Sequence, residues 1–285
     1  MPNWVQNRLV VKGKNADKVL EQYIINQPSE TCDYTFDFNR IKEMPVELGI
    51  QSGGITDNCI KVYLSTLSLN EFFDTAKMMA NAELFPGLRK NGATRLSEEE
   101  INEIVKHCID FNSNSKGTLD DPIIKSKEDV VAYGKKAVDN VRKYGSKDWY
   151  DWCCKNWGTK WNACYTFYDK DEPQEVEFQT AWSDVRGLIS ELSKKHPENT
   201  FFYDFAEEQL GHYTGVCIIK NGEFLMDSAL EENSKDAYEL GFDLWGDENK
   251  EHFRFNEKSG TYEYIDEDGG AEDAEMWARR KMGLL

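Results

Sequence analysis

Half of the eight tryptophans in this 285-residue chain fall within thirteen residues, at Trp149, Trp152, Trp157 and Trp161. An indole ring offers a flat face on which a nucleobase or a peptide anchor can stack, and an N–H group that needs a partner when it is buried. Lys160 and Asn162 belong to the same block and would supply polar contacts. The block therefore has two interpretations: an aromatic pocket for a ligand, or a structural contact that fills the gap between a helix and a sheet.

Cys153 and Cys154 are candidate nucleophiles or metal ligands. A thiol becomes reactive beside a base or a cation, and none of the four histidines lies near these cysteines in the sequence. Adjacent cysteines also lack the C-x₂-C spacing that favours zinc. We therefore predict no metal and no cofactor, and we interpret Lys160 as an ion-pair partner rather than as a catalytic amine.

A second set of candidate catalytic residues lies near the end of a predicted strand, where Glu207 and Glu208 precede His212. Two carboxylates and a histidine could bind a divalent metal or transfer protons. Gly211 and Gly215 instead indicate a turn or a bulge, with the charged groups in solvent. An enzyme with a cysteine or a Glu–His site is kept as an alternative.

Common catalytic motifs are missing from the sequence. It contains no glycine-rich phosphate loop that ends in Lys-Ser/Thr, no G-x-G-x-x-G after a strand, and no H-E-x-x-H. It also lacks the G-x-S-x-G nucleophile elbow and the protein-kinase signatures. These absences exclude the familiar enzymes of those kinds, and we predict a non-enzymatic protein.

The charge of the chain is strongly negative and unevenly distributed. It has 34 basic and 52 acidic residues, a net charge of −18, and from residue 201 onward 21 acidic residues face 8 basic ones. Such a field repels nucleic acids and anionic membranes and attracts basic surfaces on other proteins. We therefore expect no direct nucleic-acid or membrane partner. The alternative is that the acidity only keeps the protein soluble.

The sequence also bears on the cellular location. The seven cysteines are odd in number and are spread over apolar segments, which is typical of reduced thiols in a cytosol. The first thirteen residues lack a cationic stretch followed by an apolar core, so no signal peptide is expected. No run of eighteen apolar residues predicts a membrane helix. The expected location is the cytoplasm of a host cell.

Hydrophobic periodicity predicts the elements that position these residues. In the first part of the chain, residues 5–13 read as a strand, 15–27 as a helix, and the alternation of Tyr34, Phe36 and Phe38 as a strand. Residues 59–64 are a further strand candidate. From about 67 to 144 the pattern becomes helical, with capping residues at Ser97 and Ser126. We interpret this stretch as a helical insertion in an α+β domain.

The second part of the chain predicts a strand at 164–168, a strand at 176–181, a helix capped by Ser183, and a strand at 200–205. A hairpin at 216–226 turns at Asn221-Gly222, and another joins 253–255 to 262–264. This order predicts an α+β fold with a mainly antiparallel sheet in a ferredoxin-like, split βαβ arrangement. The predicted domains are 1–222, which contains the insertion, and an acidic β-hairpin extension over 223–285.

Several segments resemble one family of uncharacterised proteins with a ferredoxin-like domain, which phages, prophages and conjugative plasmids carry. The most specific is the tryptophan-rich stretch from Trp149 to Ala163. The other matching segments are the start Met1-Pro-Asn-Trp4 with Asn7 and Gly13, Pro45-Val-Glu-Leu48, Phe178-Gln-Thr-Ala-Trp-Ser183, and the run from Tyr203 through Glu208 to Gly215. Val5 and Asp184-Val185 depart from the family pattern, which has a cysteine and prolines there.

The resemblance implies the fold and a mobile-element origin but no reaction. The word ferredoxin describes only the topology, since no iron–sulfur cysteine spacing is present. The matching segments add three candidate ligand- or partner-binding residues to the tryptophan block: Trp182, Tyr203 and Glu208.

The leading hypothesis is therefore a phage or plasmid accessory protein that binds a host or defence protein with a basic surface. The charge asymmetry, the resemblance and the missing catalytic motifs all favour it. The second hypothesis is a small-ligand binder, for a nucleotide-like molecule, that uses the tryptophan block as a stacking wall.

Overall fold

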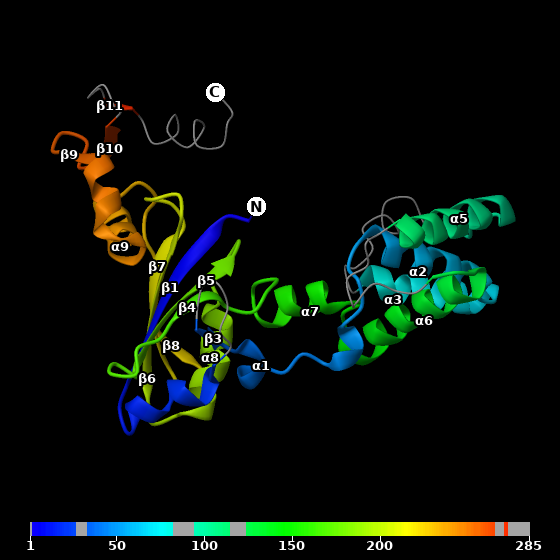
Figure 1. The fold of residues 1–285 in the computed structure, drawn as a ribbon, viewed down its shortest axis with the longest axis horizontal. Coiled ribbons are helices and arrows are strands. Elements are labelled where there is room, and N and C mark those ends of the chain that lie inside the picture. Colours follow the sequence, from blue (N-terminus) through cyan, green and yellow to red (C-terminus); the bar gives the residue numbers. More distant parts are fainter. Residues whose placement is uncertain (1, 27–32, 82–93, 115–123, 266–270, 273–285) are drawn as a thin grey trace. The chain divides into compact units, whose positions relative to one another are not determined.

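The computed structural model describes residues 2–26, 33–81, 94–114, 124–265 and 271–272 (Figure 1). The chain divides into two compact units, which we call the sheet unit (Met1–Glu43 and Trp157–Leu285) and the helical unit (Met44–Asn156). The predicted insertion at about 67–144 lies within the helical unit. Over the described ranges, no helix has the length and apolar character needed to cross a membrane.

The sheet unit contains an eight-stranded sheet in which every neighbouring pair is antiparallel. Its order is β2-β3-β4-β5-β1-β6-β7-β8. The strands span the following residues: β1 Trp4–Lys12, β2 Ile24–Asn26, β3 Tyr34–Phe36, β4 Cys164–Phe167, β5 Glu175–Ala181, β6 Thr200–Glu207, β7 Thr214–Lys220 and β8 Glu223–Ala229.

The four central strands, β4-β5-β1-β6, have the order of a ferredoxin-like domain, which confirms the predicted α+β fold. Helix α8 (Arg186–Lys195) connects β5 to β6 as the second crossover.

The first crossover differs from the prediction of one helix over 15–27. It consists of the short 3₁₀ helices η1 (Ala16–Lys18) and η2 (Leu20–Tyr23), the strand β2, and later α1 (Phe38–Ile41). That prediction was wrong because the β-branched pair Ile24-Ile25 extends to pair with β3.

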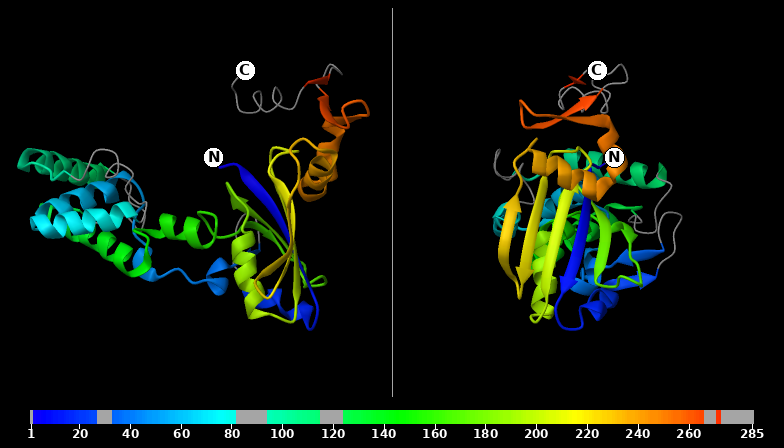
Figure 2. Two further views of the ribbon diagram at one scale, coloured as in Figure 1. Left: turned by 180° about the vertical axis from the view of Figure 1, so that it is seen from behind. Right: turned by 90° about the vertical axis from the view of Figure 1, so that its left-hand side faces the viewer.

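The two faces of the sheet carry different side chains. Leu9 and Phe201 point toward α8 with the rest of the buried core, whereas Arg8 and Asp204 point to the opposite face. Helix α9 (Lys235–Trp245) packs over one end of that second face, as the right-hand view of Figure 2 shows. Two contacts attach it there. Arg8 Nη2 lies 2.7 Å from Asp243 Oδ2, and Trp245 Nε1 donates to the carbonyl oxygen of Ala206 at 3.0 Å.

The chain after the sheet forms a small module that we call the C-terminal module (residues 231–265). It contains α9, the 3₁₀ helix η4 (Asp247–His252), and the strands β9 (Phe253–Asn256) and β10 (Thr261–Ile265), to which β11 (Ala271–Glu272) adds. Tyr238, Phe242, Phe253 and Tyr262 form its buried aromatic core. The predicted 253–264 hairpin is confirmed, and most of the predicted acidic tail (266–275) lies outside the described residues.

The predicted boundary between residues 222 and 223 falls within the β7–β8 hairpin. Asn221 and Gly222 have φ values of 48° and 82°, as a type I′ turn requires, so the predicted turn is confirmed. Strand β8 is therefore part of the main sheet and forms one of its edges. Over most of its length its residues are exposed.

The helical unit contains η3 (Val46–Leu48), α2 (Gly54–Thr66), α3 (Leu69–Asn81), α5 (Glu98–Asn114), α6 (Lys127–Tyr144) and α7 (Trp149–Asn156). The predicted caps are confirmed: Ser97 Oγ accepts from Glu100 N, and Ser126 Oγ accepts from Asp129 N. The predicted strand at residues 59–64 was wrong. This run lies in α2, whose residues pack against both α5 and α6, and a helix buried on several sides shows no clear polar face.

Candidate functional site

The tryptophan block is divided between the two units. Trp149 and Trp152 lie on α7 of the helical unit, whereas Trp157 and Trp161 belong to the sheet unit. Trp152 is buried and Trp149 is half-buried against Tyr150. The structure thus assigns these two tryptophans to the helical unit and the remaining candidate residues to the sheet unit.

Trp157 and Asn162 attach the loop before β4 to the start of α1. Trp157 is buried, its Nε1 donates to Lys42 O at 2.9 Å, and its ring packs edge-on against Phe38. Asn162 Oδ1 accepts from Phe38 N at 2.8 Å, and its Nδ2 donates to Asp37 Oδ1 at 2.9 Å. These contacts hold the loop, so the neighbouring residues Lys160 and Trp161 are fixed at the surface.

Four aromatic side chains and one lysine gather where β1 and β4 begin and β5 ends. We call this group the aromatic surface: Trp4, Lys160, Trp161, Tyr165 and Trp182. The Trp4 ring centroid lies 6.1 Å from that of Trp161 and 5.5 Å from that of Tyr165. Lys160 Nζ lies 3.6 Å from the Trp161 centroid and 5.6 Å from the Trp182 centroid. Trp161 is 38% exposed, Tyr165 47% and Trp182 56%.

Two members of the aromatic surface have an unusual backbone conformation. Tyr165 has a φ of 47° and Trp182 a φ of 75°. A bulky residue in this left-handed region is disfavoured by about 1–2 kcal/mol because its Cβ approaches the following carbonyl oxygen. Both side chains are largely exposed, so they recover little of this cost by burial. The fold therefore holds two large rings at the surface in a disfavoured backbone conformation that their limited burial does not offset.

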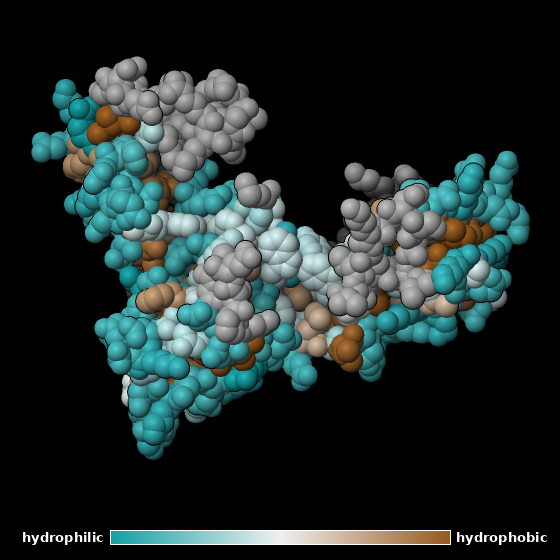
Figure 3. Space-filling model, viewed as in Figure 1, coloured by the Kyte–Doolittle hydropathy of each residue, from teal (hydrophilic) through white to brown (hydrophobic). Residues whose placement is uncertain are grey.

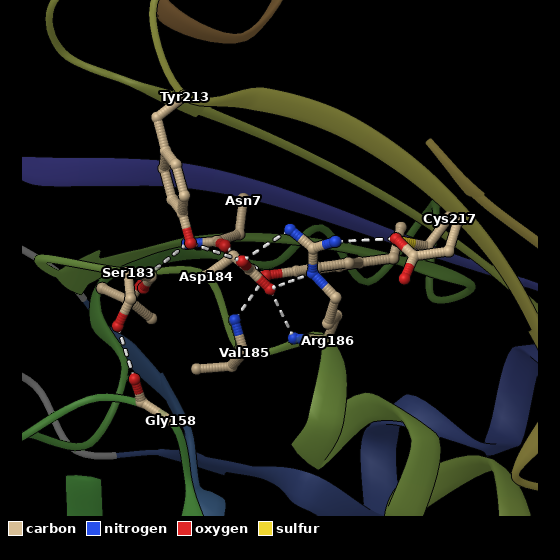
Figure 4. Close-up of polar contacts among 11 residues, drawn as sticks. Asn7, Gly158, Ser183, Asp184, Val185, Arg186, Tyr213 and Cys217 are labelled. Atoms are coloured by element: carbon tan, nitrogen blue, oxygen red, sulfur yellow. Dashed lines mark hydrogen bonds and ion pairs between the residues drawn. The ribbon is translucent and has the colours of Figure 1, made fainter. Parts of the chain in front are cut away.

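A buried polar network fixes the chain that follows Trp182, and Figure 4 shows part of it. Tyr203 is fully buried, and its hydroxyl donates to Asn7 Oδ1 at 2.5 Å and accepts from Val185 N at 2.9 Å. Asn7 Nδ2 donates to Thr180 Oγ1 and to the carbonyl oxygen of Phe178. Burial raises the pKa of Tyr203 well above its usual value. Tyr203 is therefore a neutral structural group that connects β1, β6 and the start of α8.

Asp184 and Arg186 extend this network toward β7 and β8. Asp184 accepts from Arg186 through both carboxylate oxygens, and its Oδ2 also accepts from Tyr213 Oη at 2.7 Å. Arg186 Nη1 donates to Asp227 Oδ1 at 2.7 Å. The hydrogen bond with Asp184 raises the pKa of the Arg186 guanidinium, and burial raises the pKa of Tyr213 to about 12. Figure 4 shows the Arg186 and Tyr213 side chains converging on Asp184.

The predicted cap of α8 by Ser183 was wrong. Ser183 Oγ instead donates to the carbonyl oxygen of Gly158, and Asp184 Oδ1 accepts from Arg186 N at the start of the helix. An aspartate is an equally good acceptor for the first N–H groups of a helix, and here it is also the partner of Arg186. The Ser183 contact joins the β5–α8 turn to the loop that carries Lys160 and Trp161.

Replacing Tyr203 with phenylalanine tests the network. The change removes one hydroxyl and leaves Asn7 Oδ1 and Val185 N buried without that partner, which should lower the free energy of unfolding by about 2–3 kcal/mol. Urea unfolding followed by circular dichroism measures it. Tyr165→Phe is the matched control, since Tyr165 is exposed, and its effect should stay below about 0.5 kcal/mol. Equal midpoints for the two variants would contradict the structural role of Tyr203.

Of the two candidate nucleophiles, Cys154 is exposed, whereas Cys153 has an environment that opposes reactivity, as does the further cysteine Cys217. Cys153 is buried, its Sγ lies 3.7 Å from Met44 Sδ, and burial raises the pKa of its thiol to about 12. Cys217, whose Sγ donates to Asp227 Oδ1, also has a pKa raised to about 12 by burial. A thiol with such a pKa is almost entirely protonated near neutral pH. The chemistry of these two cysteines is therefore that of small buried side chains.

The residues of the predicted Glu–His site have separate partners. Glu207 Oε1 accepts from Asn3 Nδ2 at 2.6 Å, whereas His212 Nδ1 lies 3.5 Å from Glu232 Oε2. Glu208 is exposed, and its backbone N–H donates to Trp4 O at 2.9 Å. Within the described part of the chain, no group of three histidine, cysteine or acidic side chains is arranged to hold a metal ion. Glu208 is thus a neighbour of the aromatic surface.

Sequence reasoning missed two members of the aromatic surface, Trp4 and Tyr165. Trp4 pairs with Ala181 across β1 and β5, which places it next to Trp182. The pairing of Cys164 with Gln179 brings Tyr165 to the same end of the sheet. The sequence places each of these aromatics near the end of a predicted strand, which was a usable signal. However, the strand register that brings them together depends on pairing between distant segments and cannot be predicted from neighbouring residues.

A family comparison agrees with the ferredoxin-like strand order. Residues 156–246 match the family model described as the ferredoxin-like domain in Api92-like protein. The crystal structure of protein api92 from Yersinia pseudotuberculosis is similar over 81% of this chain and 99% of that chain, at 11% sequence identity and a TM-score of 0.38. No curated protein matches the sequence. Residues 156–246, which carry Lys160, Trp161 and Trp182, are thus similar to the ferredoxin-like domain of Api92-like proteins, in line with the predicted resemblance to a ferredoxin-like family.

Proposed function

We propose that this is a non-enzymatic accessory protein of a phage or plasmid, which binds a host or defence protein through its acidic C-terminal module. One observation carries the proposal. Residues 231–265 contain ten acidic and four basic side chains and form a folded platform that is attached to the sheet. Exposed carboxylates project from α9, from η4 and from the segments that flank them: Glu231, Asp236, Asp247, Glu248 and Glu251.

The physical argument concerns charge that is fixed in space. Carboxylates on a packed platform keep their spacing, so they can complement a basic surface without first being ordered. Hydrophilic side chains also cover most of the visible surface of the sheet unit in Figure 3. A strongly acidic surface accelerates encounters with a basic partner, and salt screens that attraction.

Neutralising three acidic residues of the module tests the proposal. In the triple variant Asp236→Asn, Glu248→Gln, Glu251→Gln we expect binding of the partner to weaken by about tenfold, since each lost exposed charge contributes about 0.5 kcal/mol. The tagged protein is recovered from infected or plasmid-bearing host cells at low and high salt. Native mass spectrometry then identifies the bound protein, and a titration gives its affinity.

The matched control is the triple variant Glu99→Gln, Glu103→Gln, Glu128→Gln. It changes the net charge by the same amount at exposed positions of the helical unit. Partner binding should survive in this control and should weaken with salt as in the unmodified protein. Equal loss in both triple variants, or recovery of no protein partner, would contradict the proposal.

The exposed rings of Trp161 and Trp182 favour a second candidate function, the binding of a nucleotide-like small ligand. A base could stack on an indole that is already held at the surface, and Lys160 would then neutralise a phosphate. Trp182→Ala tests this candidate because the Trp182 ring is exposed and can stack on a base, whereas Trp157, another candidate stacking residue, is buried. A nucleotide should quench the tryptophan fluorescence of the unmodified protein, and the quenching should be reduced in the variant.

A further inference from the structure

The aromatic surface already holds a cation. The Lys160 ammonium lies 3.6 Å from the centroid of the Trp161 ring and within 6 Å of the Trp182 ring. These distances are typical of a cation–π contact, in which the negative face of the ring attracts the positive group. Two indoles therefore lie within 6 Å of one ammonium group, and proteins use more than one aromatic ring around a cation to bind cationic ligands.

The surroundings of the aromatic surface are acidic rather than basic. Glu207 ends β6 and Glu208 follows it, and the backbone of Glu208 is hydrogen-bonded to that of Trp4. Glu208 is exposed, and Glu207 is half-exposed. The net charge of −18 adds a long-range field of the same sign. Glu207, Glu208 and the net charge attract a cation that approaches this end of the sheet and repel a phosphate, which Lys160 alone among the members of the aromatic surface would attract.

The rings gain little from the fold itself. Trp182 remains 56% exposed in a left-handed backbone conformation, and the buried network of Asn7, Asp184 and Tyr203 fixes the turn that presents it. Exposed aromatic side chains on a rigid support are the features of a binding anchor, because little conformational entropy is lost when a partner docks.

We propose that the aromatic surface binds an arginine side chain of a partner protein, and that Lys160 occupies the site until the arginine displaces it. A guanidinium group is planar and weakly hydrated, so it stacks on an indole better than an ammonium does. The site thus exchanges a lysine of the same chain for an arginine of the partner. This inference rests on the proposed function, since it names the side chain by which a basic partner is anchored.

Removal of Lys160 should change the affinity for an arginine side chain and the affinity for a nucleotide in opposite directions. Lys160 competes with an incoming cation and repels it, so its removal should tighten arginine binding. The same lysine would attract a phosphate, so its removal should weaken nucleotide binding. The sign of the Lys160 effect therefore separates the two ligand classes.

The experiment uses the full chain with ¹⁵N-labelled tryptophan and follows the indole N–H signals by NMR. The probe is the tripeptide acetyl-Gly-Arg-Gly-amide, compared with its lysine and glutamine analogues and with AMP at constant ionic strength. We expect the arginine peptide to shift the signals of Trp161 and Trp182 in a saturable way. In Lys160→Gln it should bind about three- to fivefold more tightly, and in Trp182→Ala at least about threefold more weakly.

Lys12→Gln is the matched control. Lys12 lies 4.7 Å from the centroid of Phe202 in the same unit, so the variant removes a comparable cation–π lysine and an equal charge away from the aromatic surface. Arginine binding in Lys12→Gln should equal that of the unmodified protein. Three results would overturn the inference. The first is that Lys160→Gln binds the arginine peptide no more tightly than Lys12→Gln does, and the second is that the glutamine peptide binds as well as the arginine peptide. The third is that AMP binds the unmodified protein and that Lys160→Gln abolishes this binding.

The two proposals can fail separately. Arginine binding at Trp161 and Trp182 can be absent while the C-terminal module still captures a basic protein, which would leave the proposed function and remove this inference. Conversely, saturable arginine binding without an effect of the acidic triple variant on partner capture would retain the inference and contradict the proposed platform.

Discussion

Replacing Gly134 with alanine should destabilise the helical unit by about 3 kcal/mol or more. Gly134 lies on α6 where that helix crosses α2, and a methyl group at this position would collide with the carbonyl group of Cys59 and lie 2.9 Å from Ile60 N. These are backbone atoms that no rotamer change can move, so the two helices would have to separate. Their separation would disturb the buried contacts of Ile60 and Val138.

The direction of the stability change in Gly134→Ala is informative because helix propensity alone predicts the opposite change, a stabilisation. Alanine is favoured over glycine inside a helix by about 1 kcal/mol, so an unhindered substitution should stabilise α6. The measurement is urea unfolding followed by circular dichroism. Gly54→Ala, at the start of α2, is the control, since nothing lies within 4 Å of the added methyl group. A stable Gly134→Ala protein would show that α2 and α6 do not approach so closely.

Replacing Asp148 with asparagine should stabilise the helical unit at pH 7.5 by about 1–3 kcal/mol. Asp148 is fully buried, and burial, together with repulsion from Asp151, raises the pKa of its carboxyl group to about 6. The folded protein therefore binds this proton more tightly than the unfolded chain does. The resulting stability is fully present below pH 4 and is lost as the pH rises to 6, where the buried carboxylate becomes charged.

Asparagine removes this charge and keeps an acceptor for Asp151 N, which lies 3.0 Å from Asp148 Oδ1. The difference in unfolding free energy between the variant and the unmodified protein should therefore grow from pH 4 to pH 6 and remain constant above pH 7. Urea unfolding at four pH values measures it, with the exposed Asp74→Asn as control. Loss of stability in Asp148→Asn at pH 7.5 would show instead that the carboxylate is stabilised by the neighbouring Lys147.

Elements with local chemical signals could be predicted from the sequence. Ser97 and Ser126 cap helices because each hydroxyl lies three residues before the N–H group that it accepts from. Asn221 and Gly222 specify their turn because both tolerate a positive φ. In each case the interacting groups are neighbours in the chain, so no knowledge of the tertiary structure is needed.

Elements that depend on distant contacts were harder to predict. The apolar run at 59–64 suits a buried strand or a buried helix equally well, and its packing against α5 and α6 decides for the helix. The same limit applies to the candidate site. The sequence analysis grouped the tryptophans that are close along the chain, whereas strand pairing places Trp4 beside Tyr165 and Trp182, which follow it by more than 150 residues.

The position of the helical unit within the chain has a consequence for the order of folding. Among the described strands, β1 pairs with β5 and β6, and the ribosome synthesises both of these after the whole stretch Met44–Asn156. The helices of that stretch find their partners within it, and such local contacts form faster than pairings across a long loop. We expect the helical unit to fold while β1 is still unpaired, because β5 and β6 have not yet been synthesised. A compact insertion then brings the distant strands nearer than a disordered chain of the same length would.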